Sequence, residues 1–217
     1  MSDGWESRRL QMVEALRKGG IRDERVLAAM EEVPRHLFVA EAFRSQAYAL
    51  DASLNIGEGQ TISQTRVVAA MTAAAQVGPD DRVLEVGTGS GYQAAILARL
   101  ARFVFTVERL PKLARMAKQR LDALGFENVS IKVMDGTLGW RSQGPYAAIV
   151  VTAGAPRVPE LLVEQLTEGG RLVVPVGPRD HQVLQVVIRR GQRVITREIG
   201  NALFVPLVGR HGWEEEE

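Results

Sequence analysis

The sequence predicts an α/β fold in which a doubly wound, mostly parallel seven-stranded sheet ends in an antiparallel C-terminal hairpin. From Arg82 onward, short runs rich in β-branched residues alternate with helical stretches, a pattern typical of parallel βαβ units. The last two strand runs, 182–189 and 193–199, have only Arg190-Gly191-Gln192 between them, and so short a link makes an antiparallel pair. Before this region the apolar residues recur at helical spacing, which predicts an N-terminal helical extension.

The N-terminal extension covers residues 1–76 and includes a polar loop at 57–65. Its helical pattern is interrupted at Gly19 and Gly20 and is broken at Pro34, because the residue before a proline avoids the helical conformation. The helical ranges expected are 6–47, with these interruptions, and 64–76. We expect these helices to form a cap over the carboxyl edge of the sheet.

The core follows at residues 77–209, and the acidic residues "EEEE" close a solvated tail at 210–217. With 217 residues in total, we expect a single domain overall. Strands are expected at 82–86, 103–107, 129–134, 147–151, 171–176, 182–189 and 193–199, and helices at 92–100, 111–124 and 159–166.

Composition excludes several classes of function. A formal net charge of +1 gives no general attraction to nucleic acid or to anionic membranes, and the arginines are scattered. The chain has no cysteine, and its three histidines are far apart in sequence, so we expect no metal site. Because the N-terminus is charged and no apolar run approaches a membrane span, we expect a soluble, cytoplasmic protein, by default a monomer.

A glycine-rich loop follows the first core strand, in "VLEVGTGSGY". Gly87, Gly89 and Gly91 permit positive φ angles and close approach of a ligand, while Thr88 lies between them; a tight strand-to-helix turn is the alternative interpretation. The spacing is GxGxG. A dinucleotide fingerprint needs glycine where this chain has Tyr92, which argues against a dehydrogenase.

Carboxylates end the first three core strands. Glu85 would repel a pyrophosphate but attract an ammonium group. Glu108, about twenty residues beyond the loop, is placed to accept hydrogen bonds from ribose hydroxyls. Asp135 is expected beside an adenine, with Gly136 allowing close approach, although this pair alone also fits an ordinary turn. Together they predict S-adenosylmethionine as cofactor, and the sheet resembles the Rossmann-like class I methyltransferase fold.

Longer motifs carry a more specific resemblance. They are "RHLFV", "GEGQTISQT", "VLEVGTGSGYQAAILARL", "VERLPKLARMAKQRL", "DGTLGW", "YAAIVVTAGAPRVPELLVEQLTEGGRLVVPVG" and "FVPLVG". In this order, over residues 10–209, the chain resembles the protein-L-isoaspartate O-methyltransferases. The "GQTIS" loop and "VTAGAP" are more specific to that family than the cofactor motif is.

The resemblance implies a repair enzyme. It would methylate the α-carboxylate of L-isoaspartyl, and possibly D-aspartyl, residues in damaged proteins or peptides, so that the ester collapses to a succinimide. Ser63 takes the active-site position of the family. Thr61 and Ile62 line the same pocket and are expected to contact the cofactor. By the same resemblance, the substrate-binding residues are Gln60, Thr61, Ser63, Thr152 and Ala153.

The chemistry agrees with this assignment. A carboxylate is ionised at pH 7 and is already nucleophilic, so no general base is needed and alignment must supply the rate. The hydroxyls of Thr61 and Ser63, with N–H groups of the following helix, would form an anion site. Ser63 is alternatively the N-cap of a helix beginning near Gln64, although Arg66 occupies the position where a capping box has Glu or Gln.

Two departures and three alternatives stand beside this interpretation. Thr65 replaces the family's usual proline, a change that we expect to loosen the loop, and Met134 replaces a glycine before Asp135. The main alternative is a class I methyltransferase acting on RNA or on a small molecule. A nucleoside-binding module without turnover is the second, and a dehydrogenase is the third.

Overall fold

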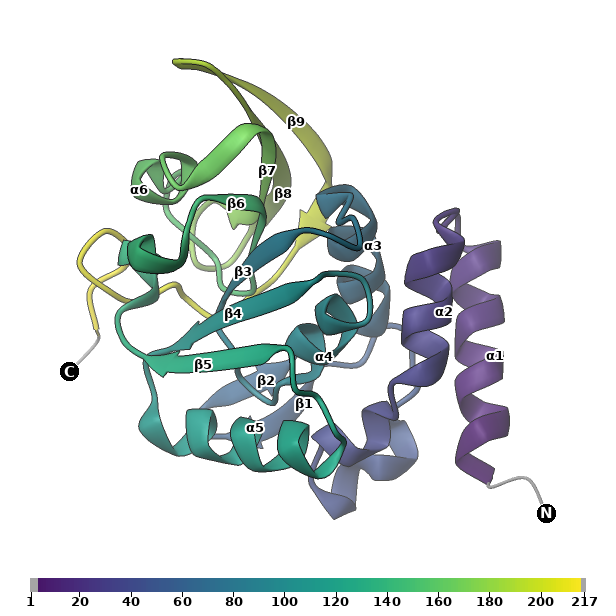
Figure 1. Ribbon diagram of the computed structural model, residues 1–217. Coiled ribbons are helices and arrows are strands. Elements are labelled where there is room, and N and C mark those ends of the chain that lie inside the picture. The colour runs from purple at the N-terminus through teal and green to yellow at the C-terminus, as the bar shows by residue number, and fades with distance from the viewer. Residues whose placement is uncertain (1–3, 216–217) are drawn as a thin grey trace.

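The computed structural model describes residues 4–215, and within them seven strands form one sheet in the order β5-β4-β3-β6-β7-β8-β9 (Figure 1). The strands are β3 (Arg82–Val86), β4 (Phe103–Glu108), β5 (Val129–Val133), β6 (Tyr146–Val151), β7 (Leu166–Val176), β8 (Gln182–Arg190) and β9 (Arg193–Ala202). The strands β3 to β7 pair in parallel, and β8 and β9 pair antiparallel. The predicted sheet and its C-terminal hairpin are confirmed.

The strand order reverses at β3, which pairs with β4 on one side and with β6 on the other. In open parallel sheets, ligands bind beyond the carboxyl ends of the strands at such a reversal. The residues at these ends are Val86, Glu108 and Val151. The topology therefore directs the search for a site to the loops that follow β3, β4 and β6.

Alternation along the central strands buries both faces of the sheet. Val83 belongs to one apolar cluster, which includes residues of α3 (Thr65–Ala75), α4 (Tyr92–Ala98) and α5 (Pro111–Ala123). Leu84 and Val86 belong to the cluster on the other face, with residues of α6 (Glu160–Val163). The short 3₁₀ helices η3 (Gly136–Leu138) and η4 (Arg141–Gln143) follow β5 on the chain.

The N-terminal helices do not cap the carboxyl edge as expected. Helices α1 (Gly4–Lys18) and α2 (Glu24–Glu32) form an outer layer beside the core, where α2 packs against α3 and α4 (Figure 1). The buried residues of α2 are apolar, so they add to the cluster on the α3–α4 side. Beyond Pro34 the chain forms only the 3₁₀ helices η1 (Arg35–Phe38) and η2 (Glu41–Gln46), which corrects the helix expected up to residue 47.

The expected loop at 57–65 is partly a β-hairpin. Strands β1 (Leu54–Gly57) and β2 (Gln60–Ile62) pair antiparallel across a turn in which Gly57, Glu58 and Gly59 all have positive φ angles. Glycine tolerates that conformation without steric cost, which explains the two glycines of the motif. Helix α3 begins at Thr65, whose buried hydroxyl donates to the carbonyl of Ala49 at 3.0 Å.

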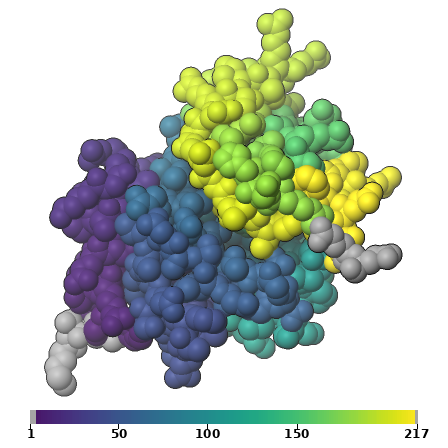
Figure 2. Space-filling model, turned by 180° about the vertical axis from the view of Figure 1, so that it is seen from behind, coloured from purple at the N-terminus to yellow at the C-terminus, as the bar shows by residue number. Residues whose placement is uncertain are grey.

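The C-terminal segment 203–213 returns across the carboxyl edge of the sheet. The Leu207 amide donates to the carbonyl of Gly154, and the Gly154 amide donates to the carbonyl of Val205. The Trp213 indole also donates to the carbonyl of Gly154, at 3.0 Å. Figure 2 shows this segment in yellow against the blue residues of the N-terminal extension. The described part of the tail is also held, because Glu215 forms an ion pair with Arg109 at 2.7 Å. Glu216 and Glu217 lie outside the described residues.

Candidate active site

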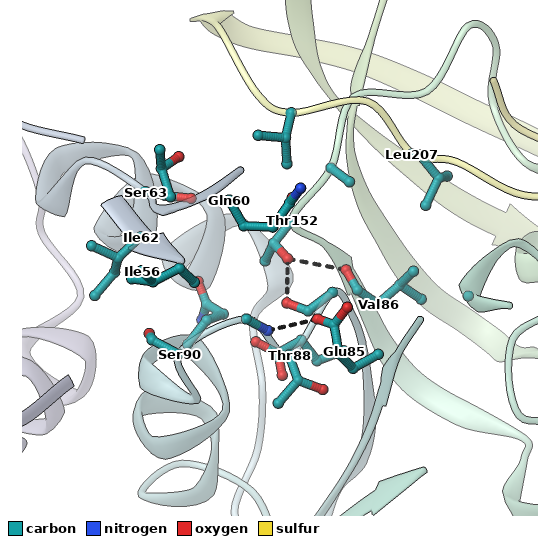
Figure 3. A pocket seen from close by; sticks show the side chains of 18 of the residues that line it. Ile56, Gln60, Ile62, Ser63, Glu85, Val86, Thr88, Ser90, Thr152 and Leu207 are labelled. Atoms are coloured by element: carbon teal, nitrogen blue, oxygen red, sulfur yellow. Dashed lines mark hydrogen bonds between the residues drawn. The ribbon is translucent and has the colours of Figure 1, made fainter. Parts of the chain in front are cut away.

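A cavity lies at the carboxyl ends of β3, β4 and β6, between the β1–β2 hairpin and the C-terminal segment (Figure 3). Its empty volume is about 850 Å³ including its opening to solvent. The predicted residues that line it are Gln60, Thr61, Ile62, Ser63, Glu85, Gly87, Thr88, Gly89, Glu108, Gly136, Thr152 and Ala153. Gly91 and Asp135 are the two predicted residues that do not line it.

The glycine loop is held in a conformation that leaves its backbone facing the cavity. Gly87 has a φ of +100°, and a Cβ atom there would lie 2.4 Å from the Thr152 hydroxyl. That hydroxyl donates to the carbonyls of Gly87 at 2.7 Å and Val86 at 3.1 Å. Thr152 thus ties the end of β6 to the loop, a contact that only glycine at position 87 allows.

Gly91 has a packing role, and the cofactor contact expected of it stays a prediction. It is the residue before α4, with a φ of +91°, and a Cβ there would meet Ala117 at 3.3 Å and Leu121 at 3.4 Å. Both neighbours belong to α5. The third glycine of the motif therefore lets α4 and α5 approach each other.

Glu85 is fully buried in the cavity wall. The Thr106 hydroxyl donates to its Oε2 atom, whereas Oε1 has no hydrogen-bond partner among the described residues. Burial raises the pKa of this carboxyl group to about 8, against a smaller opposing effect from Thr106. A buried carboxyl oxygen without a partner calls for a hydrogen-bond donor, and Glu85 lines the cavity in which a bound cation would supply one.

Glu108 lies at the end of β4 with both carboxylate oxygens in use. Oε2 accepts from the Gly89 amide at 2.9 Å, and Oε1 accepts from the Leu110 amide at 3.0 Å. Each oxygen keeps a further lone pair, so a diol in the cavity would still find two acceptors.

Asp135 is not among the residues that line the cavity, so the adenine contact expected of it stays a prediction. Its carboxylate accepts hydrogen bonds from the amide and hydroxyl of Thr137 and from the amide of Arg210, at 2.8, 2.7 and 2.8 Å. These bonds tie η3 to the C-terminal segment. Gly136 does line the cavity, where a Cβ atom would lie 2.6 Å from the Val86 side chain.

Ser63 lies where the main cavity meets a smaller one, and Figure 3 shows it on the same side as Ile62 and Ile56. The smaller cavity is lined by Ser53, Thr61, Ser63, Gln64, Val67, Thr152, Leu203, Phe204 and Val205. Within residues 4–215 no hydrogen bond engages the Ser63 hydroxyl, and the N-cap of α3 is Gln64. The alternative in which Ser63 caps the helix is therefore wrong.

The expected contribution of the α3 N-terminus to an anion site is reduced. The Arg66 amide donates to the carbonyl of Leu50 at 3.2 Å, so it does not face the cavity as a free donor. An anion beside Ser63 would meet hydroxyls more than helix amides.

Sequence reasoning missed several lining residues, among them Tyr92, Gln93, Arg109 and the run 205–208. Tyr92 is 1 % exposed and packs in the core, and it also forms part of the cavity wall. The run 205–208 falls within "FVPLVG", which the sequence marked as a motif without a role. Its apolar residues have no strand or helix period from which a cavity wall could be predicted.

The donor set fits S-adenosylmethionine. Glu85 offers an orphaned oxygen to an ammonium, Glu108 offers acceptors to a ribose, and glycines 87, 89 and 136 leave room for close backbone contact.

Among the described residues, no group of three His, Asp or Glu side chains is arranged to hold a metal ion. No helix in residues 4–215 is long and apolar enough to span a membrane.

The fold and the cavity together define a class I methyltransferase. A solved protein-L-isoaspartate O-methyltransferase superposes with a TM-score of 0.85 at 29% identity, covering 94% of this chain and 67% of that one. A putative enzyme of the same name from Plasmodium falciparum, in complex with S-adenosyl-L-homocysteine, gives 0.78 at 25% identity, covering 94% and 98%. The chain therefore has the architecture of S-adenosylmethionine-dependent enzymes.

Sequence comparison identifies the family. The family model described as protein-L-isoaspartate(D-aspartate) O-methyltransferase matches residues 7–212. The protein-L-isoaspartate O-methyltransferase of Syntrophotalea carbinolica is 52% identical over 97% of both chains, and that of Methanoculleus marisnigri is 51% identical over 99% of this chain and 98% of its own. This chain belongs to the protein-L-isoaspartate(D-aspartate) O-methyltransferase family. The expected family, fold and cofactor are confirmed.

Proposed function

We propose that the chain moves a methyl group from S-adenosylmethionine to the α-carboxylate of L-isoaspartyl residues in damaged proteins and peptides, which primes succinimide formation. The observation that carries this proposal is the junction of two cavities at Thr61, Ser63 and Thr152. The larger cavity has the hydrogen-bond acceptors for the cofactor, and the smaller cavity is proposed to take a carboxylate-bearing chain. Family membership supports the same reaction.

The reaction needs alignment more than proton transfer. A substrate carboxylate with an ordinary pKa near ~4 is ionised at pH 7 and is nucleophilic without a base. S-adenosylmethionine, when bound, supplies a methyl group activated by a sulfonium. The chain has to hold the carboxylate oxygen in line with that carbon and to exclude water. Such alignment is worth up to roughly 7–11 kcal/mol in favourable systems.

We assign Ser63 the central role on the substrate side. Its unengaged hydroxyl can donate to the incoming carboxylate, and Thr61 offers a second hydroxyl from the adjacent strand β2. Gln60 and Ala153 complete the wall near them. Thr152 acts indirectly, because its hydroxyl is used by the glycine loop. These contacts stay weak enough to leave the oxygen nucleophilic, since only interactions that strengthen in the transition state raise the rate.

On the cofactor side, we assign Glu85 to the ammonium of the methionine moiety and Glu108 to the ribose hydroxyls. Gly87, Thr88 and Gly89 supply the loop backbone, and Gly136 supplies space beside the base, with Ile62 on the opposite wall. Burial of both carboxylates strengthens these contacts relative to water.

The setting of the reaction is also part of the proposal. A net charge of +1 supports a protein that acts on other proteins without binding nucleic acid or membranes, and we propose a cytoplasmic monomer. We divide the single domain into an N-terminal extension to residue 76, a core to residue 209 and the tail, with the boundary at 209 crossed by the Asp135–Arg210 contact.

The test is methyl transfer to paired peptides that differ only in one isoaspartyl or aspartyl residue. We expect label on the isoaspartyl peptide alone, and equal labelling of both would refute the proposal. A third peptide with D-aspartate measures the second substrate of the family name. Bulk RNA serves as the control for the alternative methyltransferase, and label in RNA but not in peptide would favour that alternative.

A further inference from the structure

Arg35 is a buried arginine that has no acidic partner within residues 4–215. It begins η1, is 0 % exposed, and is among the largest fully buried side chains. The groups that influence its pKa are the tyrosines Tyr92 and Tyr48, and burial lowers that pKa. A guanidinium stays protonated in proteins, so a full positive charge lies inside the molecule. Burial of such a charge is costly, and its position therefore requires an explanation.

The guanidinium connects two distant segments. Its Nε atom donates to the carbonyl of Ala47 at 2.7 Å, and its Nη2 atom donates to the carbonyl of Ser63 at 2.7 Å. Its Cζ atom lies 4.7 Å from the centre of the Tyr92 ring. Nη1 has no hydrogen-bond partner in the part of the chain that the structure describes.

Two of the three residues that Arg35 contacts belong to the wall of the main cavity. Ser63 and Tyr92 each line it, so the charge lies directly behind the residues that face the reacting groups. Two further bonds run between the same segments: the Thr65 hydroxyl donates to Ala49, and the Arg66 amide donates to Leu50. Among these hydrogen bonds, the one from the Arg35 guanidinium is made to Ser63 itself.

We propose that Arg35 is a positioning residue for methyl transfer: its two-armed contact fixes the backbone of Ser63, and its buried charge lies behind the place where the substrate carboxylate binds. The inference rests on the proposed function of Ser63. A lysine keeps the charge but cannot reproduce the planar fork that reaches two carbonyls. Replacing the guanidinium is therefore expected to lower turnover more than it weakens cofactor binding.

The experiment compares Arg35→Lys with Arg82→Lys. Arg82 makes the same two kinds of contact, a hydrogen bond to the carbonyl of Gln143 at 2.6 Å and a ring contact to Phe105 at 4.8 Å, at the start of β3 and away from the cavity. Each variant is assayed at the same interval below its own melting temperature. The measured quantities are kcat and KM for an isoaspartyl peptide and the Kd of S-adenosyl-L-homocysteine.

For Arg35→Lys we expect a fall in kcat of about tenfold or more, with the Kd of S-adenosyl-L-homocysteine within about twofold of wild type. Arg82→Lys should keep kcat and KM within about twofold. Equal effects of the two variants, unchanged kcat in Arg35→Lys, or a Kd that rises as much as kcat falls would each overturn the proposal. A wild-type enzyme inactive on the isoaspartyl peptide would instead overturn the proposed function.

If Arg35→Lys does not fold, Thr65→Val provides the second test. It removes the neighbouring hydrogen bond between the same two segments and leaves the charge in place. We expect a smaller fall in kcat, about two- to fivefold, again without a change in the Kd of S-adenosyl-L-homocysteine. Wild-type kcat in this variant would overturn the positioning role.

Discussion

Glu85 combines two properties that rarely occur together on a structural side chain, a pKa raised to about 8 and an oxygen without a partner. At pH 7 the group is mostly protonated in the free protein. An ammonium placed beside it favours the ionised form, so cofactor binding must release a proton.

Titration calorimetry in buffers of different ionisation enthalpy measures that proton. We expect S-adenosyl-L-homocysteine to release close to one proton at pH 7, and this release should fall as the pH rises through the pKa of Glu85. Glu85→Gln should bind more weakly and release none. Wild-type protein that binds without proton release at pH 7 would contradict the assignment of Glu85 to the ammonium.

Ser63 is expected to act on turnover. Because Ser63 lines both cavities, Ser63→Ala should lower kcat/KM for an isoaspartyl peptide by roughly tenfold or more, since a hydrogen bond to a charged group is worth about 1.5–3 kcal/mol. The affinity for S-adenosyl-L-homocysteine should stay unchanged. The opposite pattern, with binding lost and turnover at saturation kept, would show that Ser63 serves the cofactor.

Gly87 allows a matched test of space against backbone strain. Gly87 and Gly20 have similar φ angles, +100° and +104°. A Cβ atom at Gly87 would meet Thr152, whereas a Cβ atom at Gly20 would have no non-neighbouring atom of the described residues within 4 Å. Alanine at either position should cost about 1–3 kcal/mol of unfolding free energy. Only Gly87→Ala should also weaken binding of S-adenosyl-L-homocysteine, by tenfold or more, in calorimetry. Equal binding by both variants would mean that the Gly87–Thr152 contact has no part in the site.

At the level of secondary structure, β9 is an exposed edge strand. It pairs only with β8, and Val194, Ile195 and Ile199 are 49 %, 46 % and 40 % exposed. Arg193 and Arg197 lie on the same strand, and charged side chains discourage pairing between sheet edges. We expect the double variant Arg193→Val/Arg197→Val to aggregate faster by light scattering, and the double lysine variant to stay like wild type. Unchanged scattering would show that another feature protects this edge.

The elements that sequence predicted best are those buried on both faces. Residues 82–86 form β3 within the predicted limits, because apolar residues on both faces and a following glycine turn mark its ends. The β1–β2 hairpin was missed because its strands are short and partly polar, and their stability comes from packing of Leu54 and Ile56 into the core. Gly91 and Asp135 also make tertiary contacts that the motif did not predict. Their partners, Leu121 and Arg210, are distant in sequence, so the motif alone could not distinguish packing from ligand contact.

Across the whole molecule, the C-terminal segment closes a cavity whose other walls come from the β1–β2 hairpin, helices α3 and α4, and the loops that follow β3, β4, β5 and β6. Asp135 fastens this segment to η3, and its pKa is lowered by hydrogen bonds from Arg210 and Thr137 that outweigh burial. We expect Asp135→Ala to weaken binding of S-adenosyl-L-homocysteine several-fold and to speed amide hydrogen exchange at Leu207 and Gly209. Weakened binding with unchanged exchange would instead favour a direct contact between Asp135 and the cofactor.

The central claim is that the protein aligns a carboxylate that is already ionised, and that no residue transfers a proton. The most direct test is the single-turnover rate of methyl transfer to a saturating isoaspartyl peptide, with saturating S-adenosylmethionine, between pH 6 and pH 8.5. A rate that is independent of pH across this range is the predicted result. A rate that rises or falls tenfold per pH unit would reveal an essential acid or base and would contradict the account.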